Sequence, residues 1–447
     1  MKFFDMEQKK ETTELLINED GYLDVVKKIG TPNSNQGFFL TIPSDENLAS
    51  IYTGDGMAKK YLNLLCDDMT RAWINIQEDT DGEILDYLEN IDCQKTFKEA
   101  IRGAKLFGGS IIFMVIDDGK EPEEPVNVAS IKSILKLKAF DRTKITIDET
   151  QYYSDLKKIN FGEPQYFTLQ TDSGELKKVH ESRCLVFKGD YYPPDHLTRV
   201  STTYSKFWGI SVLTPLYKIF EKYGISILAL FETFTKLNVD VLTLKNLMGL
   251  LKTKDGENLL KKRIEALDYA KSITNTIVLD SDEQYQTVSQ QLNNVADTFS
   301  KLEQTLSAQT GIASTIFFGT SAKGLNATGD NEVRIYYDKI SAMQKEELTQ
   351  PLKKIINYVL ISKDYTGEKI EKPKIIYNSL WQMTDKEIVE MRNKQADTDV
   401  KYIDSGVVDP NEIRKSRFGN DNYSIETSID GDELEPMESE PDDEANI

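Results

Sequence analysis

Residues 317–344 read FFGTSAKGLNATGDNEVRIYYDKISAMQ, and this stretch joins a loop of small side chains to a helix. Gly319 and Gly329 bound the loop, and glycine tolerates backbone angles that are closed to other residues. Thr328 or Asp330 can cap the helix, because both side chains accept hydrogen bonds from the N–H groups of a first helical turn. The stretch therefore predicts a loop that can shift, followed by a helix.

The helix is predicted to continue to about Val359, through apolar positions that recur at helical spacing. Pro351 lies inside it, where the missing N–H and the clash of the ring with the preceding turn predict a kink or a break. A strand over 374–377 and a helix from about Asp385 to Ser405 are expected to follow.

Two long helices with an insert between them are predicted before this stretch. Apolar residues step by three and four from Leu216 to Phe234, which predicts a helix that starts at Ser211. Apolar residues from Val288 to Leu306 alternate steps of four and three, the narrow seam of a helix that packs lengthwise on a neighbour. The insert is expected to contain a strand, a basic helix and a second strand, at residues 239–244, 259–271 and 276–279.

The part of the chain before residue 205 is predicted to be rich in strands. Small helices are expected in the first 80 or so residues, and a helix through Phe97 and Ile101 is predicted to end at Gly108-Gly109. The apolar run that follows predicts a buried strand over 111–116. Further strands are expected at residues 144–147, 166–169 and 184–187. The fold class is therefore α+β.

The charge balance restricts the classes of partner. The 447 residues include 54 basic and 74 acidic side chains, a formal net charge of -20. Such a chain does not fit a protein whose affinity for nucleic acid depends on neutralising phosphates. Any contact with DNA is expected to be loose, local or repulsive.

Cysteine usage and hydropathy favour a reducing cytoplasm. Cys66, Cys93 and Cys184 lie far apart without a CxxC pair, so neither a disulfide framework nor a zinc site is predicted. No apolar run approaches the roughly 20 residues of a membrane span, and neither a signal peptide nor an anchor is expected.

The C-terminal end is strongly acidic. No basic residue follows Arg417, and nine of the fifteen residues from Asp430 to Glu444 are acids. Such composition predicts a disordered tail.

The residues of common enzyme sites are scarce. His180 and His196 are the only histidines in the sequence, which argues against a HExxH metal site and a Ser-His-Asp triad. The GxxxxGK[ST] pattern is absent from the loop, where Lys323 precedes Gly324. No catalytic, cofactor-binding or metal-binding residue is therefore predicted, and no cofactor.

Carboxylate pairs leave one enzymatic alternative open. Asp117-Asp118 and the acids of residues 280–283 could hold magnesium in a nuclease, although each group follows a strand, where a turn is the favoured interpretation. His180 is interpreted as a structural or surface residue in preference to a base. Three isolated tryptophans are expected to take part in ordinary packing and not to stack on bases, namely Trp73, Trp208 and Trp381.

Residues 311–352 closely resemble a stretch of tailed-bacteriophage portal proteins, in the family formerly classed as a domain of unknown function, with the pattern FG-x-SPxGLNATGE-x-x-x-R-x-YY. Ala322 departs from this pattern, which often has proline there, and the acidic tail matches nothing in it. Three weaker matches occur in the family's order, namely AIRGAKLFGGSIIFMVIDDG, VHESRCLVF and FWGISVLTPLYKIF.

The resemblance implies a portal fold, in which subunits form a ring, usually twelvefold, with wing, stem, clip and crown regions. Two long stem helices would bracket a small α/β clip. The implied regions are the N-terminal wing (1–205), stem helices (206–236 and 286–311), clip (237–285), tunnel loop (312–329), C-terminal wing with the kinked helix and strand (330–383), crown (384–420) and disordered acidic tail (421–447).

The resemblance also implies contact residues. Lys323 is the only basic residue in the loop and is expected to face DNA, although a solvated or intersubunit lysine fits equally well. The tunnel-loop residues are Gly319, Thr320, Ser321, Lys323, Gly324, Asn326, Thr328 and Gly329. The clip could contact partners through Lys252, Lys254, Lys261, Lys262 and Arg263, or these residues could form a solvated helix face.

The expected function is a phage portal, the ring at the capsid vertex through which DNA is packaged and ejected, and not an enzyme. The implied partners are further copies of the chain, the terminase large subunit, a head-completion adaptor, the major capsid and scaffolding proteins, and double-stranded DNA without sequence specificity. The expected location is the virion, after assembly in the host bacterial cytoplasm. A metal-dependent DNA-processing nuclease is the alternative, and a generic acidic scaffold is favoured by the tail alone.

Overall fold

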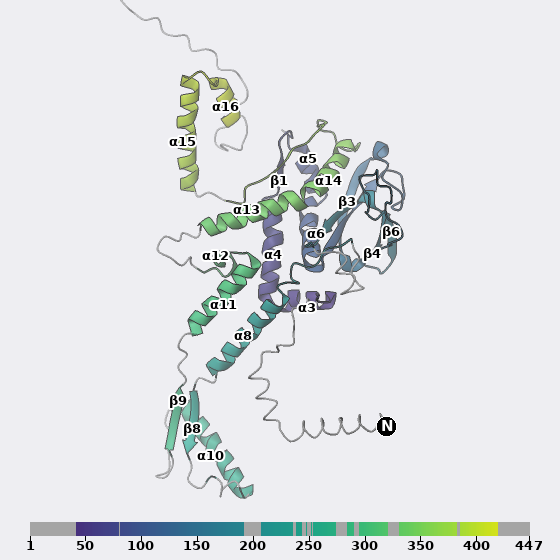
Figure 1. The fold of residues 1–447 in the computed structure, drawn as a ribbon. Coiled ribbons are helices and arrows are strands. Elements are labelled where there is room, and N and C mark those ends of the chain that lie inside the picture. Colours follow the sequence, from purple (N-terminus) through teal and green to yellow (C-terminus); the bar gives the residue numbers. More distant parts are fainter. Residues whose placement is uncertain are drawn as a thin grey trace, which may run out of the picture. The chain divides into compact units, whose positions relative to one another are not determined.

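The computed structural model describes most of the chain between residues 42 and 418 (Figure 1). The described residues are 42–79, 81–191, 207–235, 238–243, 247, 252, 254–273, 284–289, 295–320, 330–381 and 385–418. They divide into two compact units, the first ending at Asn378 and the second beginning at Ser379. Each unit is described by itself.

A helix, a glycine turn and a strand form the centre of the first unit, as the sequence predicted. Helix α6 (Cys93–Phe107) buries Phe97 and Ile101, and it ends at Gly108 with φ 85°. The N–H of Gly108 donates to the carbonyl of Ala104 at 2.8 Å, which closes the helix. Glycine fits this position because a left-handed backbone costs it little. Strand β2 (Gly109–Asp117) starts at the next residue.

Two three-stranded antiparallel sheets form the β-rich region (Figure 1). In the first, β2 lies between β3 (Ser133–Asp141) and β7 (Cys184–Lys188). In the second, β5 lies between β4 and β6. The bounds of this sheet are β4 (Ile145–Ile147), β5 (Tyr166–Gln170) and β6 (Leu176–His180). One cluster of buried side chains joins the sheets, including Ile111, Phe140, Phe167 and Trp208. The α+β class is confirmed.

Distant parts of the sequence close the first unit. Strand β1 (Ile74–Ile76) pairs with β10 (Ile375–Tyr377), so the predicted strand at 374–377 is confirmed and its partner lies about 300 residues earlier. The small helices expected near the N-terminus are α3 (Asp45–Gly54) and α4 (Gly56–Arg71), followed by α5 (Glu83–Asn90). Asp55 caps α4, since its Oδ1 accepts the N–H groups of Met57 and Ala58 at 2.8 Å. Single turns of 3-10 helix are η1 (Val128–Ser130), η2 (Arg142–Lys144) and η3 (Glu181–Arg183).

The order helix, α/β insert, helix is present. Helix α8 comes first, a strand, a helix and a second strand follow, and α11 comes last. The bounds are α8 (Tyr217–Thr235), β8 (Asn238–Thr243), α10 (Lys254–Ile273), β9 (Gln284–Ser289) and α11 (Val295–Thr310). Strands β8 and β9 pair antiparallel from Asn238 opposite Ser289 to Thr243 opposite Gln284.

Two predicted boundaries in this region were wrong. Residues 286–289 belong to β9, so the second long helix starts at Val295 and Val288 is not part of its seam. The pairing of β9 with β8 supplies the backbone hydrogen bonds and overrides the helical spacing. The first long helix starts at Tyr217, because residues 212–216 form turns. The strand predicted at 276–279 lies outside the described residues.

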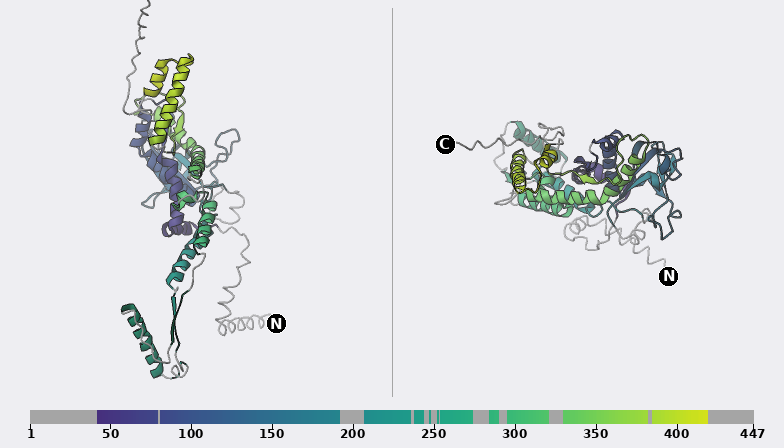
Figure 2. Two further views of the ribbon diagram at one scale, coloured as in Figure 1. Left: turned by 90° about the vertical axis from the view of Figure 1, so that its left-hand side faces the viewer. Right: turned by 90° about the horizontal axis from the view of Figure 1, so that it is seen from above.

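The break predicted at Pro351 is confirmed. Figure 2 shows the green part of the chain, which includes these helices, from two further sides. Helix α13 (Asp330–Glu347) ends four residues before the proline, and α14 (Thr349–Ile361) starts a new ladder in which the N–H of Leu352 donates to Leu348 at 2.9 Å. Pro351 has no N–H for the carbonyl of Glu347, and its ring crowds that group. The helix therefore divides where the proline removes its hydrogen bond.

The second unit contains two helices. Helix α15 (Asp385–Asp404) confirms the helix predicted from Asp385, and α16 (Pro410–Phe418) was not predicted. Arg417 joins them, because its Nε lies 3.0 Å from Oδ2 of Asp399. The acidic tail after Phe418 lies outside the described residues.

Candidate functional site

The segment that leads into the predicted tunnel loop is fixed at both ends. Helix α12 (Ser314–Phe317) is followed by Gly319, whose φ is 70°. The hydroxyl of Thr320 donates to the carbonyl of Ser314 at 3.3 Å. On the far side of the loop, Glu332 of α13 accepts a hydrogen bond from Thr315 at 3.3 Å. Both ends of the loop therefore attach to one short helix.

Only part of the loop itself is described. Gly319 and Thr320 lie where the sequence placed them, directly after α12. The remaining predicted loop residues lie outside the described residues, namely Ser321, Lys323, Gly324, Asn326, Thr328 and Gly329.

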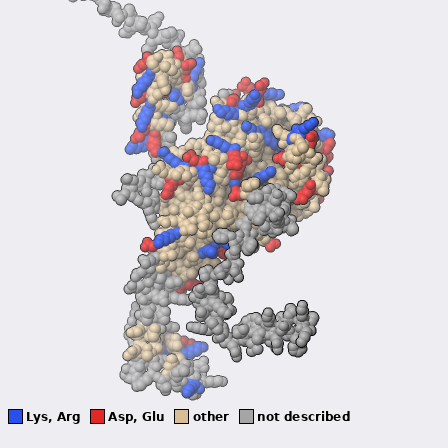
Figure 3. All heavy atoms as spheres, viewed as in Figure 1, with Lys and Arg blue, Asp and Glu red and all other residues tan. Residues whose placement is uncertain are grey.

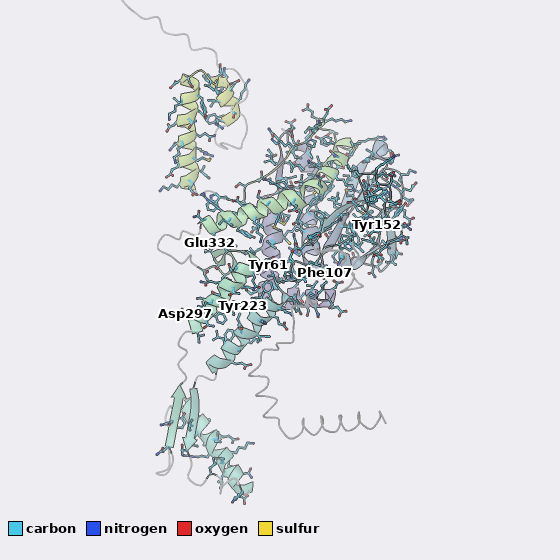
Figure 4. All side chains as sticks on the ribbon, viewed as in Figure 1. Tyr61, Phe107, Tyr152, Tyr223, Asp297 and Glu332 are labelled. Carbon is cyan, nitrogen blue, oxygen red and sulfur yellow. The ribbon has the colours of Figure 1, made fainter. Side chains whose placement is uncertain are left out.

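Aromatic side chains hold α12 against the long helices (Figure 4). Phe317 is fully buried, and its ring centroid lies 5.0 Å from that of Phe318. The ring of Tyr223 in α8 lies 6.2 Å from both Phe318 and Phe299 of α11. Ring pairs at these separations are favourable beyond their buried area. The loop therefore starts from a packed aromatic base.

The two tyrosines of the family-like motif connect α13 to α4. Tyr336 is 2% exposed and donates to Oδ2 of Asp68 at 2.8 Å. Arg71 donates to the hydroxyl of Tyr337 at 2.9 Å and pairs with Asp68 at 2.9 Å. Burial, together with the negative charge of Asp68, raises the pKa of Tyr336 well above its ordinary value. Tyr336 therefore stays neutral and keeps its donor.

An ion pair between a buried lysine and a half-buried glutamate fixes the end of α13. Lys105 of α6 has a side chain that is 3% exposed, and its Nζ lies 2.6 Å from Oε1 of Glu347. Burial raises the pKa of Glu347, although the ammonium group of Lys105 opposes this shift. Gln344 donates to the carbonyl of Met69 at 2.9 Å in the same interface. The position of the helix that follows the loop is therefore set by polar contacts with α4 and α6.

The basic residues of the insert lie on or near α10. Lys252, Lys261 and Lys262 are exposed, and Arg263 is half-buried. Lys254 is the first residue of α10. This placement fits both a contact surface and a solvated helix face.

The carboxylates proposed for a metal site have other partners. The side chain of Asp118 is fully buried, and its oxygens lie 2.9 and 3.0 Å from Nη2 of Arg183. The same oxygens accept the N–H groups of Asn127 at 2.8 Å and Lys120 at 3.1 Å. Asp117 is half-exposed and pairs with Lys132. Asp118 is therefore a structural anchor, which confirms the turn interpretation for this pair.

The nuclease alternative gains no support elsewhere. Within the described part of the chain, no group of three or more histidine, cysteine or acidic side chains is placed to hold a metal ion. The acids at 280–283 lie outside that part.

No helix among the described residues is both long and apolar enough to span a membrane.

His180 is a structural residue, as the sequence analysis favoured. Its side chain caps the turn η3, because Nδ1 accepts the N–H of Ser182 at 3.1 Å. Its ring contacts Tyr166 edge to face at 5.3 Å. Burial, with help from Lys354 and Arg183, lowers the pKa of His180 below its ordinary value, against the charge of Glu181.

The His180→Asn variant should have a flatter dependence of stability on pH. Asparagine can accept the same N–H but does not titrate. In the wild type the unfolded chain takes up the proton first, so stability is lost as pH falls from about 6.5 through the lower pKa of folded His180. The melting temperature of the wild type should therefore fall relative to that of His180→Asn between about pH 7.5 and 5. A difference between the two melting temperatures that stays constant over this range would contradict the prediction.

Sequence reasoning missed a cluster of glycines that lie in or next to the three weaker motifs. A Cβ on Gly109 would overlap the ring of Trp208, with 2.7 Å to Cδ2, and one on Gly209 would lie 2.5 Å from the carbonyl oxygen of Asp190. Gly189 donates to the carbonyl of Gly108 at 2.9 Å. These glycines allow three chain segments to pack backbone against backbone. The sequence signal that could have indicated this packing was the presence of glycine at positions 108, 109, 189 and 209.

The tryptophans in the first unit pack as predicted. Trp208 is 5% exposed, and its ring lies 4.9 Å from Phe207. The ring of Trp73 lies 5.7 Å from that of Phe97.

The anchored loop, the divided helix and the helix–insert–helix order define a protein of the portal class. The phage portal protein family matches residues 46–401, and the chain belongs to this family.

Two relatives extend the comparison. The anti-CBASS protein Acb1 of Caulobacter sp. (strain RHG1) is 28% identical over 407 residues, which are 86% of this chain and 62% of that protein. An uncharacterized protein of Haemophilus influenzae (strain ATCC 51907 / DSM 11121 / KW20 / Rd) is 22% identical over 437 residues, 94% of each chain. The chain thus spans about 62% of the length of the Caulobacter relative.

A solved structure has a similar fold. A chain in the neck of a native gene transfer agent (GTA) particle, computed with C12 symmetry, superposes with a TM-score of 0.50 and is 11% identical. The superposition covers 84% of this chain and 93% of that chain.

Proposed function

We propose that this chain forms the portal ring of a phage-like particle, the passage through which double-stranded DNA is packaged and ejected. The match of the portal family to residues 46–401 carries the proposal. The similar fold in a C12-symmetric neck supports a ring of twelve copies. The proposed location is the virion, at the capsid vertex, after assembly in the host bacterial cytoplasm.

The order of elements supports a proposed division of the chain into the regions of a portal ring. Helices α8 and α11 are the stem, and the insert between them is the clip. The unit up to Asn378, apart from stem, clip and loop, is the wing, and residues 384–420 are the crown. The loop between α12 and α13 narrows the channel, and its base on Phe317 and Phe318 sets where the narrowing lies.

The proposed channel surrounds DNA without binding it tightly. A formal net charge of -20 provides acidic groups that repel phosphates along a channel wall, so DNA can slide. Figure 3 shows basic and acidic side chains interspersed over the α/β part of the first unit, with no continuous basic surface on the face drawn. The proposed DNA contact is therefore confined to the loop, where Lys323 is the basic residue.

The proposed protein partners are those of a packaging vertex. The terminase large subunit and a head-completion adaptor dock on the clip, where Lys261 and Lys262 are exposed on α10. The capsid and scaffolding proteins surround the wing. The role is structural and not enzymatic, since translocation is driven by the docked motor.

Deletion of the gene tests the function. Particles made without the protein should contain no DNA, and expression of the chain in trans should restore filled particles. DNA-filled particles in its absence would refute the proposal.

The Lys323→Glu variant tests the loop. It should assemble normally but lower the titre of infectious particles about tenfold or more, because the reversed charge repeats in every subunit around the DNA. Lys345→Glu makes the same charge change at an exposed position of α13 and should leave the titre unchanged. An unaltered titre for Lys323→Glu would remove the role assigned to Lys323.

A further inference from the structure

A cavity of about 750 Å³ lies beside the break between α13 and α14. Its walls come from α4, α6, α13, α14, the end of β7 and residues 207–212. Apolar side chains line much of it, namely Leu65, Phe187, Trp208, Val212, Met343 and Pro351. Leu65, Phe187 and Trp208 are buried. Small-molecule sites are usually clefts of this size with apolar walls and a few converging polar groups, so the cavity has the dimensions and walls of a ligand site.

Two polar groups line the buried side of the cavity with hydrogen-bonding capacity to spare. Tyr61 of α4 is 7% exposed (Figure 4), and within the described part of the chain its hydroxyl makes no hydrogen bond. The ammonium of Lys105 has three donors. The described residues offer it one partner, Oε1 of Glu347 at 2.6 Å, and leave Oε2 of Glu347 as an acceptor beside it. Buried polar groups without partners cost free energy, so these groups require water or a ligand.

Charged side chains stand at the mouth of the same cavity. Lys188, Asp190 and Lys339 are exposed and line it. The carboxylate of Asp190 makes no hydrogen bond or ion pair with another described residue. Burial raises the pKa of Tyr61 and Glu347 and lowers that of Lys339. The charge of Asp190 acts on each of these three groups, so the mouth and the buried groups belong to one space.

The buried donors and the acceptor beside them match the edge of a nucleobase. A base carries acceptors next to N–H donors on a flat ring, and proteins read that edge by hydrogen bonds while apolar side chains pack on the ring faces. Lys105 and Tyr61 can donate to the acceptors of the base, and Oε2 of Glu347 can accept from its N–H. At the mouth, the carboxylate of Asp190 suits a sugar hydroxyl. The ammonium groups of Lys188 and Lys339 suit a phosphate.

We propose that this cavity binds a nucleoside monophosphate, with the base inside and the phosphate at the mouth. A simple anion does not fit, because Asp190, Glu346 and Glu347 line the same cavity and would repel it. A purely apolar ligand does not fit either, because it would leave the donors of Lys105 and Tyr61 without partners. The inference is independent of the proposed ring.

Calorimetric titration of the purified chain with the four deoxynucleoside 5′-monophosphates and AMP tests the site. At least one should bind, with one nucleotide per chain, and excess inorganic phosphate should not displace it. Tyr61→Phe removes a hydroxyl that no described residue binds, so the melting temperature should stay unchanged while the affinity falls about tenfold. Asp190→Asn, at the exposed mouth, should have a similar effect. A free nucleotide and a phosphorylated strand end offer the same groups, and competition by a 5′-phosphorylated single strand distinguishes the two sources.

The controls make the same changes outside the cavity. Tyr402→Phe and Asp338→Asn alter exposed residues that do not line it, and both should keep the wild-type affinity. Absence of binding by all five nucleotides would overturn the inference. Equal affinity for inorganic phosphate would show an adventitious anion only and also overturn it, as would unchanged affinity in both Tyr61→Phe and Asp190→Asn. Each of these outcomes leaves the proposed function intact.

Discussion

The Asp118→Ala variant is expected to lose about 3–5 kcal/mol of unfolding free energy. The Asp118–Arg183 pair is buried, with side chains that are 0% and 2% exposed, and the alanine would leave a buried guanidinium without its carboxylate. The loss also frees the N–H groups of Asn127 and Lys120, which anchor the turn after β2. Urea unfolding of wild type and variant measures the difference.

The adjacent residue is the matched control. Asp117 pairs with Lys132 at 3.2 Å, but their side chains are 39% and 61% exposed, so Asp117→Ala should cost less than about 1 kcal/mol. Similar losses for the two variants would contradict the assignment of Asp118 as the structural anchor.

The pH dependence of the Asp118 contribution has a definite sign. Burial opposes ionisation, but hydrogen bonds from Asn127, Arg183 and Lys120 outweigh it and hold the pKa of Asp118 below 3.8, its ordinary value. The contribution is therefore complete above that value and is lost as pH falls through the lower pKa of the folded state. The difference in unfolding free energy between wild type and Asp118→Ala should therefore be constant near neutral pH and should become smaller only in strong acid.

The Gly189→Ala variant is the second large effect, with an expected loss on the order of 3 kcal/mol. The new Cβ would overlap the carbonyl oxygen of Ile210 and lie 2.5 Å from Cα of Gly108. Both neighbours are backbone atoms, held by the reciprocal bonds between Asp190 and Ile210 at 2.9 and 3.0 Å. Neither can move without separating β7 from the segment that leads into α8.

Gly56→Ala is the control for this substitution. Gly56 starts α4, and a Cβ there meets nothing within 4 Å. Alanine should be neutral or stabilise by up to about 1 kcal/mol, because it reduces the freedom of the unfolded chain. Thermal unfolding of the two variants compares them, and a Gly189→Ala protein as stable as Gly56→Ala would refute the close packing.

The sequence predicted elements whose pattern was local and uninterrupted. Helix α6 and strand β2 share one apolar core and are separated by glycine. The spacing of the apolar residues and the glycine turn therefore indicated the same boundary between helix and strand. Strand β3 was missed because the pairing with β2 shifts between Val115 and Ile116. The bulge leaves Leu135 63% exposed beside buried Ile134 and breaks the alternation of the strand.

Long-range partners could not be predicted. The start of the second long helix was misplaced because Val288 fits a helical seam by spacing, whereas its backbone lies in β9 opposite Val239 of β8. The candidate site shows the same limit. The motif located Tyr336, but its partner Asp68 lies 268 residues away and nothing in either local pattern connects them. Family resemblance supplied the portal class, while packing explains why the motif carries paired aromatic residues.

Electron microscopy of the purified chain shows whether its copies assemble into a ring. We predict closed rings with a central hole and twelve subunits, in agreement with the C12 symmetry of the neck that has a similar fold. A particle that remains monomeric at high concentration, or that forms open filaments without a hole, would contradict it.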